Sequence, residues 1–157
     1  METVQVSLGA RSYDISVAQD LFTSGASVGL LSPFVKGVKV LIVSDSNVFP
    51  LYGELLSRTL LVAGASGVSE SIFPAGETSK HLATVGDICR DAARAGLDRG
   101  SLIVGLGGGV VGDMAAFAAS IYMRGIRCVQ VPTSLLAMID SGVGGKTGVD
   151  QIGRAHV

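Results

Sequence analysis

The apolar residues of this chain fall into two kinds of segment that alternate along the sequence. One kind is a near-continuous apolar run of strand length, and the other is a longer stretch in which apolar residues recur at helical spacing. Continuous runs are typical of strands buried on both faces, whereas a helix that covers them shows one apolar face. The sequence therefore predicts strands over 38–43, 68–73, 101–105 and 126–131, separated by helices that open at Pro50 and that cover 79–95 and 113–123.

The first residues follow a different pattern. Apolar and polar residues alternate over 4–8 and again over 13–17, and residues 9–12 between them can turn, which predicts an antiparallel hairpin. From residue 38 onward, strands alternate with helices, and this order favours a parallel sheet covered on both faces. The predicted fold class is α/β: a doubly wound, mostly parallel, Rossmann-like sheet with an N-terminal β-hairpin.

Polar or glycine-rich loops follow the predicted strands. In open sheets of parallel strands, ligands bind beyond the carboxyl ends of the strands, where such loops meet. We therefore expect the functional site to be built from residues 45–47, 76–80, 107–113 and 133–134.

Glycine is the residue in excess, with 22 of 157 positions, against a usual share of about 7%. Gly107, Gly109 and Gly112 form a G-x-G-x-x-G pattern between an apolar strand and a helix, the context that dinucleotide binding requires. The glycines let the backbone approach a pyrophosphate, and the helix start favours an anion. The alternative, that they serve only close packing of strand and helix, stays open.

Acidic residues near this turn have two interpretations each. Asp113, at the predicted helix start, either caps the helix or takes a ribose hydrogen bond, because a carboxylate repels a bare phosphate. The acid that usually holds the ribose about 20 positions beyond the glycines is missing, since none occurs between Asp113 and Asp140. Asp45 and Glu77 are the available replacements, although each alone is equally typical of a helix entry.

A Gly-Lys-Thr triplet at residues 145–147 suggests a P-loop, but its spacing excludes one. The motif needs a glycine at position 140, where Asp140 stands, and a buried strand directly before it. Lys146 keeps two interpretations: a cation that reaches a phosphate or carboxylate from a glycine-rich loop, or a solvated lysine.

Basic residues gather in one part of a chain that is otherwise neutral. Arg124 could complement the dipole at the end of the alanine-rich helix. With Arg127 and Lys146, however, it makes residues 124–147 basic, opposed only by Asp140. This local charge suits a small anionic substrate.

Composition narrows the class of protein further. A length of 157 residues with 48% apolar content suits one domain, assigned to residues 1–150. A net charge of −1 and an isoelectric point near 6.1 offer no general attraction for nucleic acid or anionic lipid. The longest uncharged stretch, 21–35, holds serines, glycines and Pro33 and is no membrane span, and no signal peptide is expected.

Cysteine and histidine usage predicts neither a disulfide framework nor a metal site within this chain. Cys89 and Cys128 are far apart and form no C-x-x-C pair, which indicates reduced thiols in a cytoplasmic protein. His81 and His156 have no partner at ligand spacing, so we expect no metal ligands here.

Three segments carry a resemblance to a known family. They are residues 74–80, residues 107–113, and residues 131–141 running on into 144–147. With them, the sequence from about 38 to 150 resembles the N-terminal half of the 3-dehydroquinate synthases, a family of sugar-phosphate cyclases. Glycerol dehydrogenases share the glycine turn but lack the full last segment.

The resemblance implies an enzyme of the shikimate pathway, active as a homodimer when full length. It implies bound NAD that is reduced and reoxidised within one cycle, and a zinc or cobalt ion. It also implies a small phosphorylated sugar acid, 3-deoxy-D-arabino-heptulosonate 7-phosphate, as substrate, which is converted to 3-dehydroquinate and phosphate.

Matching motifs extends the resemblance to single residues. Lys146 corresponds to a lysine near nicotinamide and substrate, and Arg124 to an arginine that reaches the substrate phosphate across a dimer interface. Residues that correspond to cofactor contacts are Asp45, Asn47, Glu77 and Lys80 on the adenosine side, Gly108, Gly109, Val110, Val111, Gly112 and Asp113 around the pyrophosphate and nicotinamide, and Thr133, Ser134, Asp140 and Ser141, which complete the pocket.

The sequence departs from the family after Asp150. Members of the family continue with Gly-Lys-Asn and a helical domain that supplies a glutamate and two histidines to the metal, so these ligands are expected outside this chain. We expect residues 151–157 to be a disordered tail, and the chain to be a truncated enzyme half that binds NAD weakly and does not turn over. A polyol dehydrogenase and a non-catalytic nucleotide-binding module remain as alternatives.

Overall fold

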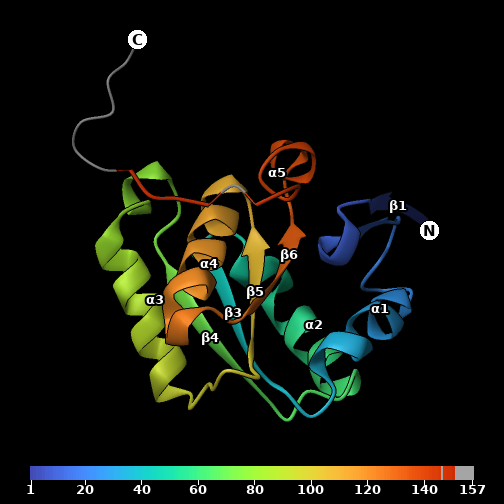
Figure 1. The fold of residues 1–157 in the computed structure, drawn as a ribbon, viewed down its shortest axis with the longest axis horizontal. Helices are drawn as coiled ribbons and strands as arrows, with labels where there is room; N and C mark the ends of the chain where they lie inside the picture. The colour runs from blue at the N-terminus through green and yellow to red at the C-terminus, as the bar shows by residue number, and fades with distance from the viewer. Residues whose placement is uncertain (146, 151–157) are drawn as a thin grey trace.

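Four parallel strands form the main sheet of the protein. The structure is a computed structural model that describes residues 1–145 and 147–150. The strand order is β4-β3-β5-β6 (Figure 1). All four predicted strands are confirmed, with bounds of Lys39–Asp45 for β3, Gly67–Phe73 for β4, Leu102–Gly107 for β5 and Arg127–Pro132 for β6.

Helices cover both faces of this sheet, which confirms the doubly wound class (Figure 1). The pairs α1 with α2 and α3 with α4 pack on opposite faces, and the short α5 follows β6. The helices are α1 (Ala26–Val35), α2 (Phe49–Val62), α3 (Leu82–Arg94), α4 (Gly109–Ile121) and α5 (Leu135–Ile139), with short 3-10 turns η1 (Gly9–Arg11), η2 (Glu77–Ser79) and η3 (Tyr122–Arg124).

Successive residues of the central strands enter different halves of the core. Leu41 and Val43 of β3 belong to the apolar cluster with α3 and α4, whereas Val40 and Ile42 belong to the cluster with α1 and α2. All four side chains are buried. Because strand side chains alternate between faces and both faces are covered, the sequence of β3 is continuously apolar.

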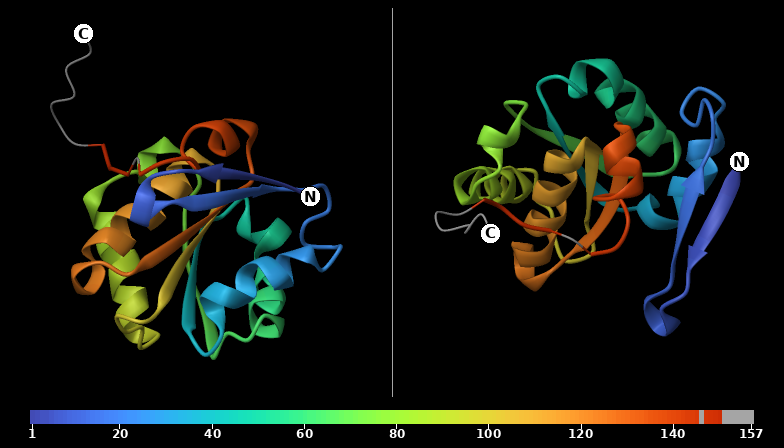
Figure 2. Two further views of the ribbon diagram at one scale, coloured as in Figure 1. Left: turned by 45° about the vertical axis from the view of Figure 1, so that its right-hand side comes forward. Right: turned by 90° about the horizontal axis from the view of Figure 1, so that it is seen from above.

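The predicted hairpin is confirmed as a separate two-stranded antiparallel sheet. It consists of β1 (Glu2–Val6) and β2 (Tyr13–Val17). In the right-hand view of Figure 2 it lies to one side of the main sheet. Over the described ranges, 1–145 and 147–150, no helix is long and apolar enough to cross a bilayer.

Helix α1 was not expected from the sequence. It buries Ser27, Leu31 and Val35, which are spaced by four residues and share one helix face. The stretch carries no charged residue, so the contrast between its buried and exposed faces is weak in the sequence.

Two predicted helix starts are wrong. Helix α3 begins at Leu82, because residues 77–79 form η2 and His81 caps the helix by accepting a hydrogen bond at Nδ1 from the Thr84 amide (3.3 Å). Helix α4 begins at Gly109, four residues before the expected start, and ends at Ile121.

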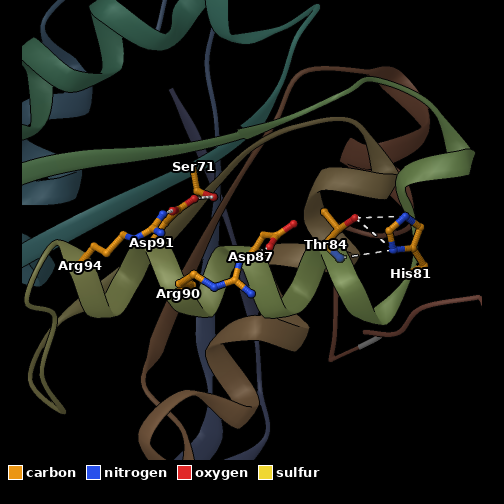
Figure 3. A network of polar contacts seen from close by, with 7 residues as sticks. All are labelled: Ser71, His81, Thr84, Asp87, Arg90, Asp91 and Arg94. Atoms are coloured by element: carbon orange, nitrogen blue, oxygen red, sulfur yellow. Dashed lines mark hydrogen bonds and ion pairs between the residues drawn. The ribbon is translucent and has the colours of Figure 1, made fainter.

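One side-chain hydrogen bond ties α3 to the sheet, and the other polar contacts drawn in Figure 3 are local to the helix and its cap. At its N-terminus lies the His81 cap, and near its C-terminus the Ser71 hydroxyl of β4 donates to Asp91 Oδ2 (2.7 Å). Asp91 also pairs with Arg94 (3.4 Å). The His81 cap fixes the end of the loop between β4 and α3, which carries Glu77 and Lys80.

Candidate functional site

The carboxyl ends of β5 and β6 bring the glycine turn beside the Thr133–Ser134 loop. Gly107 pairs in register with Pro132, and the Thr133 amide donates to the Gly107 carbonyl (2.9 Å). A Cβ built on Gly108 would lie 3.6 Å from the Ser134 hydroxyl. These two predicted loops therefore form one side of a common site.

The glycines of the turn have different structural roles. A Cβ on Gly107 would lie 2.5 Å from the Val111 side chain, so this glycine lets α4 pack on the strand end. A Cβ on Gly109 would meet only Ser141, at an ordinary distance of 3.6 Å. Close packing therefore accounts for Gly107 but leaves Gly109 available to a ligand.

The N-terminus of α4 points its backbone amides toward this open side of the turn. Gly108, which has no side chain, is the N-cap residue. The first amides of a helix lack partners within it and carry the positive end of its dipole. An anion placed at Gly108 and Gly109 would therefore be stabilised by the backbone itself.

An ion pair lies next to this helix start. Lys80 Nζ is 2.9 Å from Asp113 Oδ2, and the two side chains are only 15% and 19% exposed. The hydrogen bond to Asp113 is the largest contribution that raises the pKa of Lys80 above its ordinary value, and burial opposes it. Glu77, which is 62% exposed, lies 3.5 Å from the same ammonium.

The interpretation of Asp113 as a helix cap is wrong. It is the fifth residue of α4, and its carboxylate is bound to Lys80. Because Lys80 balances its charge, Asp113 repels a phosphate at the helix start far less than a free carboxylate would.

Two adjoining cavities of about 310 and 280 Å³ open in front of the ion pair. Both are lined by Lys80, Asp113, Asp140 and Ser141. The larger one extends along residues 147–150, and the smaller one reaches Glu77, Gly109, Val110 and Leu136.

Ser141 supplies the polar group at the centre of this site. Its hydroxyl oxygen is buried and accepts or donates no hydrogen bond within the described residues. It would lie 3.6 Å from a Cβ on Gly109 and 3.5 Å from one on Gly112. A buried hydroxyl without a partner costs free energy, and a bound ligand that forms the missing hydrogen bond removes this cost.

Asp45 and Asn47 lie at the same edge of the sheet but outside the linings of these two cavities. Asp45 Oδ1 accepts hydrogen bonds from the amides of Asn47 and Val48, both at 2.9 Å. The helix-entry interpretation of Asp45 is therefore confirmed.

The remaining predicted residues are placed as follows. Val111 and Gly112 are buried, with Val111 packed on Gly107. Ser134 caps α5 by accepting from the Ala137 amide (3.3 Å). Lys146 lies outside the described residues.

Arg124 does not end α4, as the sequence suggested, and the prediction that it complements that helix end is wrong. It belongs to η3, has a left-handed φ of 71°, and is exposed. Because η3 directly precedes β6, Arg124 lies at the amino end of that strand, away from the cavities at the carboxyl ends.

Gln130 supports the site and was missed in the sequence. Its Nε2 donates to the Gly112 carbonyl (2.9 Å), which ties the first turn of α4 to β6. The sequence offers one signal for this role: Gln130 is a polar amide between the apolar residues Val129 and Val131.

Metal-ligating side chains do not gather in the described part of the chain. No three residues of the types His, Cys, Asp and Glu come together there. Cys89 and Cys128 are both free thiols. The described residues therefore do not fit a metal centre.

Comparison with known sequences gives one family match. The sequence profile of the family described as 3-dehydroquinate synthase N-terminal matches residues 70–155. The 3-dehydroquinate synthase of Pelotomaculum thermopropionicum is 51% identical over 154 residues, which cover 96% of this chain and 40% of that protein. The chain thus spans about 40% of the length of the curated relatives it matches.

Solved structures of similar fold contain related enzymes. A 2-deoxy-scyllo-inosose synthase, complexed with carbaglucose-6-phosphate, NAD⁺ and Co²⁺, superposes with a TM-score of 0.84 at 27% identity over 96% of this chain and 41% of that one. The 2-epi-5-epi-valiolone synthase of Streptomyces hygroscopicus, with NAD⁺ and Zn²⁺ bound, superposes with a TM-score of 0.77 at 33% sequence identity. The match covers 93% of this chain and 39% of that one. A glycerol dehydrogenase of Schizosaccharomyces pombe shares the fold alone, with a TM-score of 0.55 at 16% sequence identity. The match covers 71% of this chain and 25% of that one.

Proposed function

The chain belongs to the 3-dehydroquinate synthase N-terminal family, and on that basis we propose that it is the NAD-binding part of a 3-dehydroquinate synthase. The observation that carries the proposal is the pairing of an open helix start at Gly109 with the unpartnered, buried hydroxyl of Ser141. A polyanion fits this pairing because the amides supply donors and the hydroxyl supplies one more.

The pyrophosphate of NAD would lie against Gly108 and Gly109 at the start of α4. Ser141 would donate its hydroxyl to a phosphate oxygen, and Val110 would border the ring of the nicotinamide. Lys80 would remain bonded to Asp113, so that the pair presents polar groups to the cofactor without a net negative charge.

The adenosine side is assigned to the loops after β3 and β4. We propose Asp45, Asn47 and Glu77 as contacts there. Asp45 and Asn47 lie at the carboxyl end of β3, which pairs with β5, and Glu77 follows β4, the next strand of the sheet. The exposed Glu77 carboxylate can accept hydrogen bonds from ribose hydroxyls. Thr133, Ser134 and Asp140 would complete the pocket on the nicotinamide side.

NAD would supply transient hydride storage when bound. The contribution of this chain is to orient the cofactor and the substrate. The proposed substrate is 3-deoxy-D-arabino-heptulosonate 7-phosphate, and the proposed products are 3-dehydroquinate and phosphate. A phosphorylated sugar analogue bound to a structural neighbour supports this substrate class.

Two basic residues are proposed as substrate contacts. Lys146 would approach the substrate and nicotinamide from the glycine-rich loop. Arg124 would serve the substrate phosphate of a second subunit in a homodimer, which agrees with its exposure and with its distance from the cavities of its own subunit. We place the protein in the cytoplasm, which is supported by its free thiols.

Calorimetric titration of the chain with NAD tests the binding proposal. The change is Gly109→Val, because the added side chain would project where the pyrophosphate approaches the backbone, while its Cβ meets nothing closer than 3.6 Å. We expect at least about a tenfold loss of affinity, the equivalent of one or two charge-assisted hydrogen bonds. The matched control is Gly86→Val, at an exposed position of α3 with no atom within 4 Å.

Equal affinity of the wild type and a folded Gly109→Val variant would refute this cofactor site. The whole reaction is tested by grafting residues 1–150 onto the C-terminal part of the Pelotomaculum enzyme. Phosphate release from the seven-carbon substrate without accumulation of NADH is expected. Net NADH formation from glycerol would instead identify a polyol dehydrogenase.

A further inference from the structure

The N-terminal hairpin contacts the glycine-rich loop that follows α5. The Gly144 amide donates a hydrogen bond of 2.8 Å to the phenol oxygen of Tyr13, a residue 131 positions earlier in the sequence. Gly144 has a left-handed φ of 85°, which a residue with a side chain adopts only under strain. A distant side chain therefore holds the loop at a point where its backbone conformation is unusual.

The other end of this loop is held by α5 and its C-cap residue. The Gly142 amide donates to the Ala137 carbonyl (2.7 Å), and a Cβ on Gly142 would lie 2.7 Å from that same oxygen. The Val143 amide donates to the Asp140 carbonyl (3.1 Å). Residues 140–143 are thus fixed against α5, and Tyr13 fixes the next residue of the loop.

Asp140 and Ser141, which line both cavities, lie at the start of this loop. The bonds of Gly142 and Val143 hold the loop directly after them, and the bond from Gly144 to Tyr13 adds the anchor that follows. Without that bond, the chain beyond Val143 gains freedom, and the pocket wall at Ser141 loses support.

Tyr13 is well placed to act as a fixed anchor. It is the first residue of β2 and pairs with Val6 of β1. The turn directly before it is closed by Ser12, whose hydroxyl accepts from the Leu8 amide (2.9 Å) and donates to the Gly9 carbonyl (2.7 Å). The backbone on both sides of Tyr13 is therefore held by hydrogen bonds.

We infer that Tyr13 is a positioning residue for the cofactor pocket: its phenol oxygen holds the 140–145 loop so that Ser141 faces the start of α4. This gives the N-terminal hairpin, which lies outside the main sheet (Figure 2), a role in ligand binding. The inference rests on the proposed NAD site.

The test replaces Tyr13 by phenylalanine, which keeps the ring and removes the hydrogen-bond acceptor. We expect the Gly144 amide to exchange with solvent faster in Tyr13→Phe, and NAD to bind about 2- to 10-fold more weakly, as for the loss of one hydrogen bond. The temperature midpoint of unfolding should stay within about 2 °C of the wild type, since the core is untouched. The control is Tyr52→Phe on α2, a residue that is 42% exposed and lies outside both cavity linings.

Each outcome either supports or overturns the positioning role of Tyr13. Faster exchange at Gly144 together with weaker NAD binding, neither seen in Tyr52→Phe, supports the inference. Unchanged exchange at Gly144, or unchanged affinity in a variant whose loop exchanges faster, overturns it while the proposed function stands. A wild-type chain that does not bind NAD overturns the proposed function, and this inference with it.

Discussion

Breaking the ion pair between Lys80 and Asp113 should destabilise the protein far more than breaking the contact between Lys80 and Glu77. The first pair joins two mostly buried side chains at 2.9 Å, and the second joins the same ammonium to an exposed carboxylate at 3.5 Å. Asp113→Asn and Glu77→Gln each remove one charge with little change of shape. They therefore form a matched pair of variants.

The expected magnitudes follow from distance and burial. Two unit charges 2.9 Å apart attract by about 6 kcal/mol at an effective dielectric constant of about 20. Desolvation of the two charges cancels most of this attraction. For Asp113→Asn we expect a loss of about 1.5–3 kcal/mol, the range for a hydrogen bond to a charged group, because Lys80 keeps only the weaker Glu77 contact. For Glu77→Gln the expected loss is below about 0.5 kcal/mol.

Urea unfolding followed by circular dichroism measures both free energies of unfolding, with Lys80→Met and the double variant completing a mutant cycle. The cycle should give a coupling of about 1–2 kcal/mol between Lys80 and Asp113. Equal losses in Asp113→Asn and Glu77→Gln, or no coupling in the cycle, would refute the reasoning.

The pH dependence of the same pair has a definite sign. The pKa of Lys80 is raised in the folded protein, chiefly by its hydrogen bond to Asp113. The stabilisation is therefore fully present below the pKa of an unfolded lysine, about 10.4, and is lost as the pH rises through the higher folded value. Asp113→Asn should lose stability less steeply than the wild type in this alkaline range.

Two further predictions concern glycine packing and the burial of a thiol. Gly107→Ala should lose about 1–3 kcal/mol of unfolding free energy, because its Cβ would lie 2.5 Å from the Val111 side chain. In contrast, Gly86→Ala on the exposed face of α3 should gain about 0.5–1 kcal/mol, and similar values for both in urea unfolding would contradict the packing argument. Burial raises the pKa of Cys128 to about 12, so the native thiol should resist labelling by a disulfide reagent at pH 8 and react only in urea. Peptide mass spectrometry identifies the labelled residue, and rapid labelling of native Cys128 would be evidence against its burial.

The sequence was sufficient for the central strand β3 because its burial on both faces is recorded directly in residue type, whereas β4 carries Ser69, Glu70 and Ser71. Leu41 and Val43 on one face, and Val40 and Ile42 on the other, leave no polar position in the run. The identity of the loops at the carboxyl ends follows from the strand order alone. This is why the glycine turn and the Thr133–Ser134 loop could be expected to meet.

Helix starts were less predictable because tertiary packing outweighs local preference there. Gly109 and Gly112 are poor helix formers, and their presence delayed the predicted start of α4 to Asp113. In the structure Val111 packs on Gly107, and Gln130 binds the Gly112 carbonyl, so the helix begins at Gly109. The partner of Asp113, Lys80, lies 33 positions earlier and has no signal at that range in the sequence.

The correction at α4 changes the physical account of the site. If Asp113 capped the helix, its carboxylate would occupy the amides that a phosphate needs, and the glycine turn would repel the cofactor. Since the helix begins at Gly109 and Asp113 binds Lys80 one turn later, those amides stay available and the nearby negative charge is balanced. The buried Ser141 hydroxyl faces the same point and has no partner within the described residues. A buried hydroxyl without a partner costs about 1–3 kcal/mol, and a ligand that accepts hydrogen bonds from the free amides at the start of α4 would also give this hydroxyl a partner.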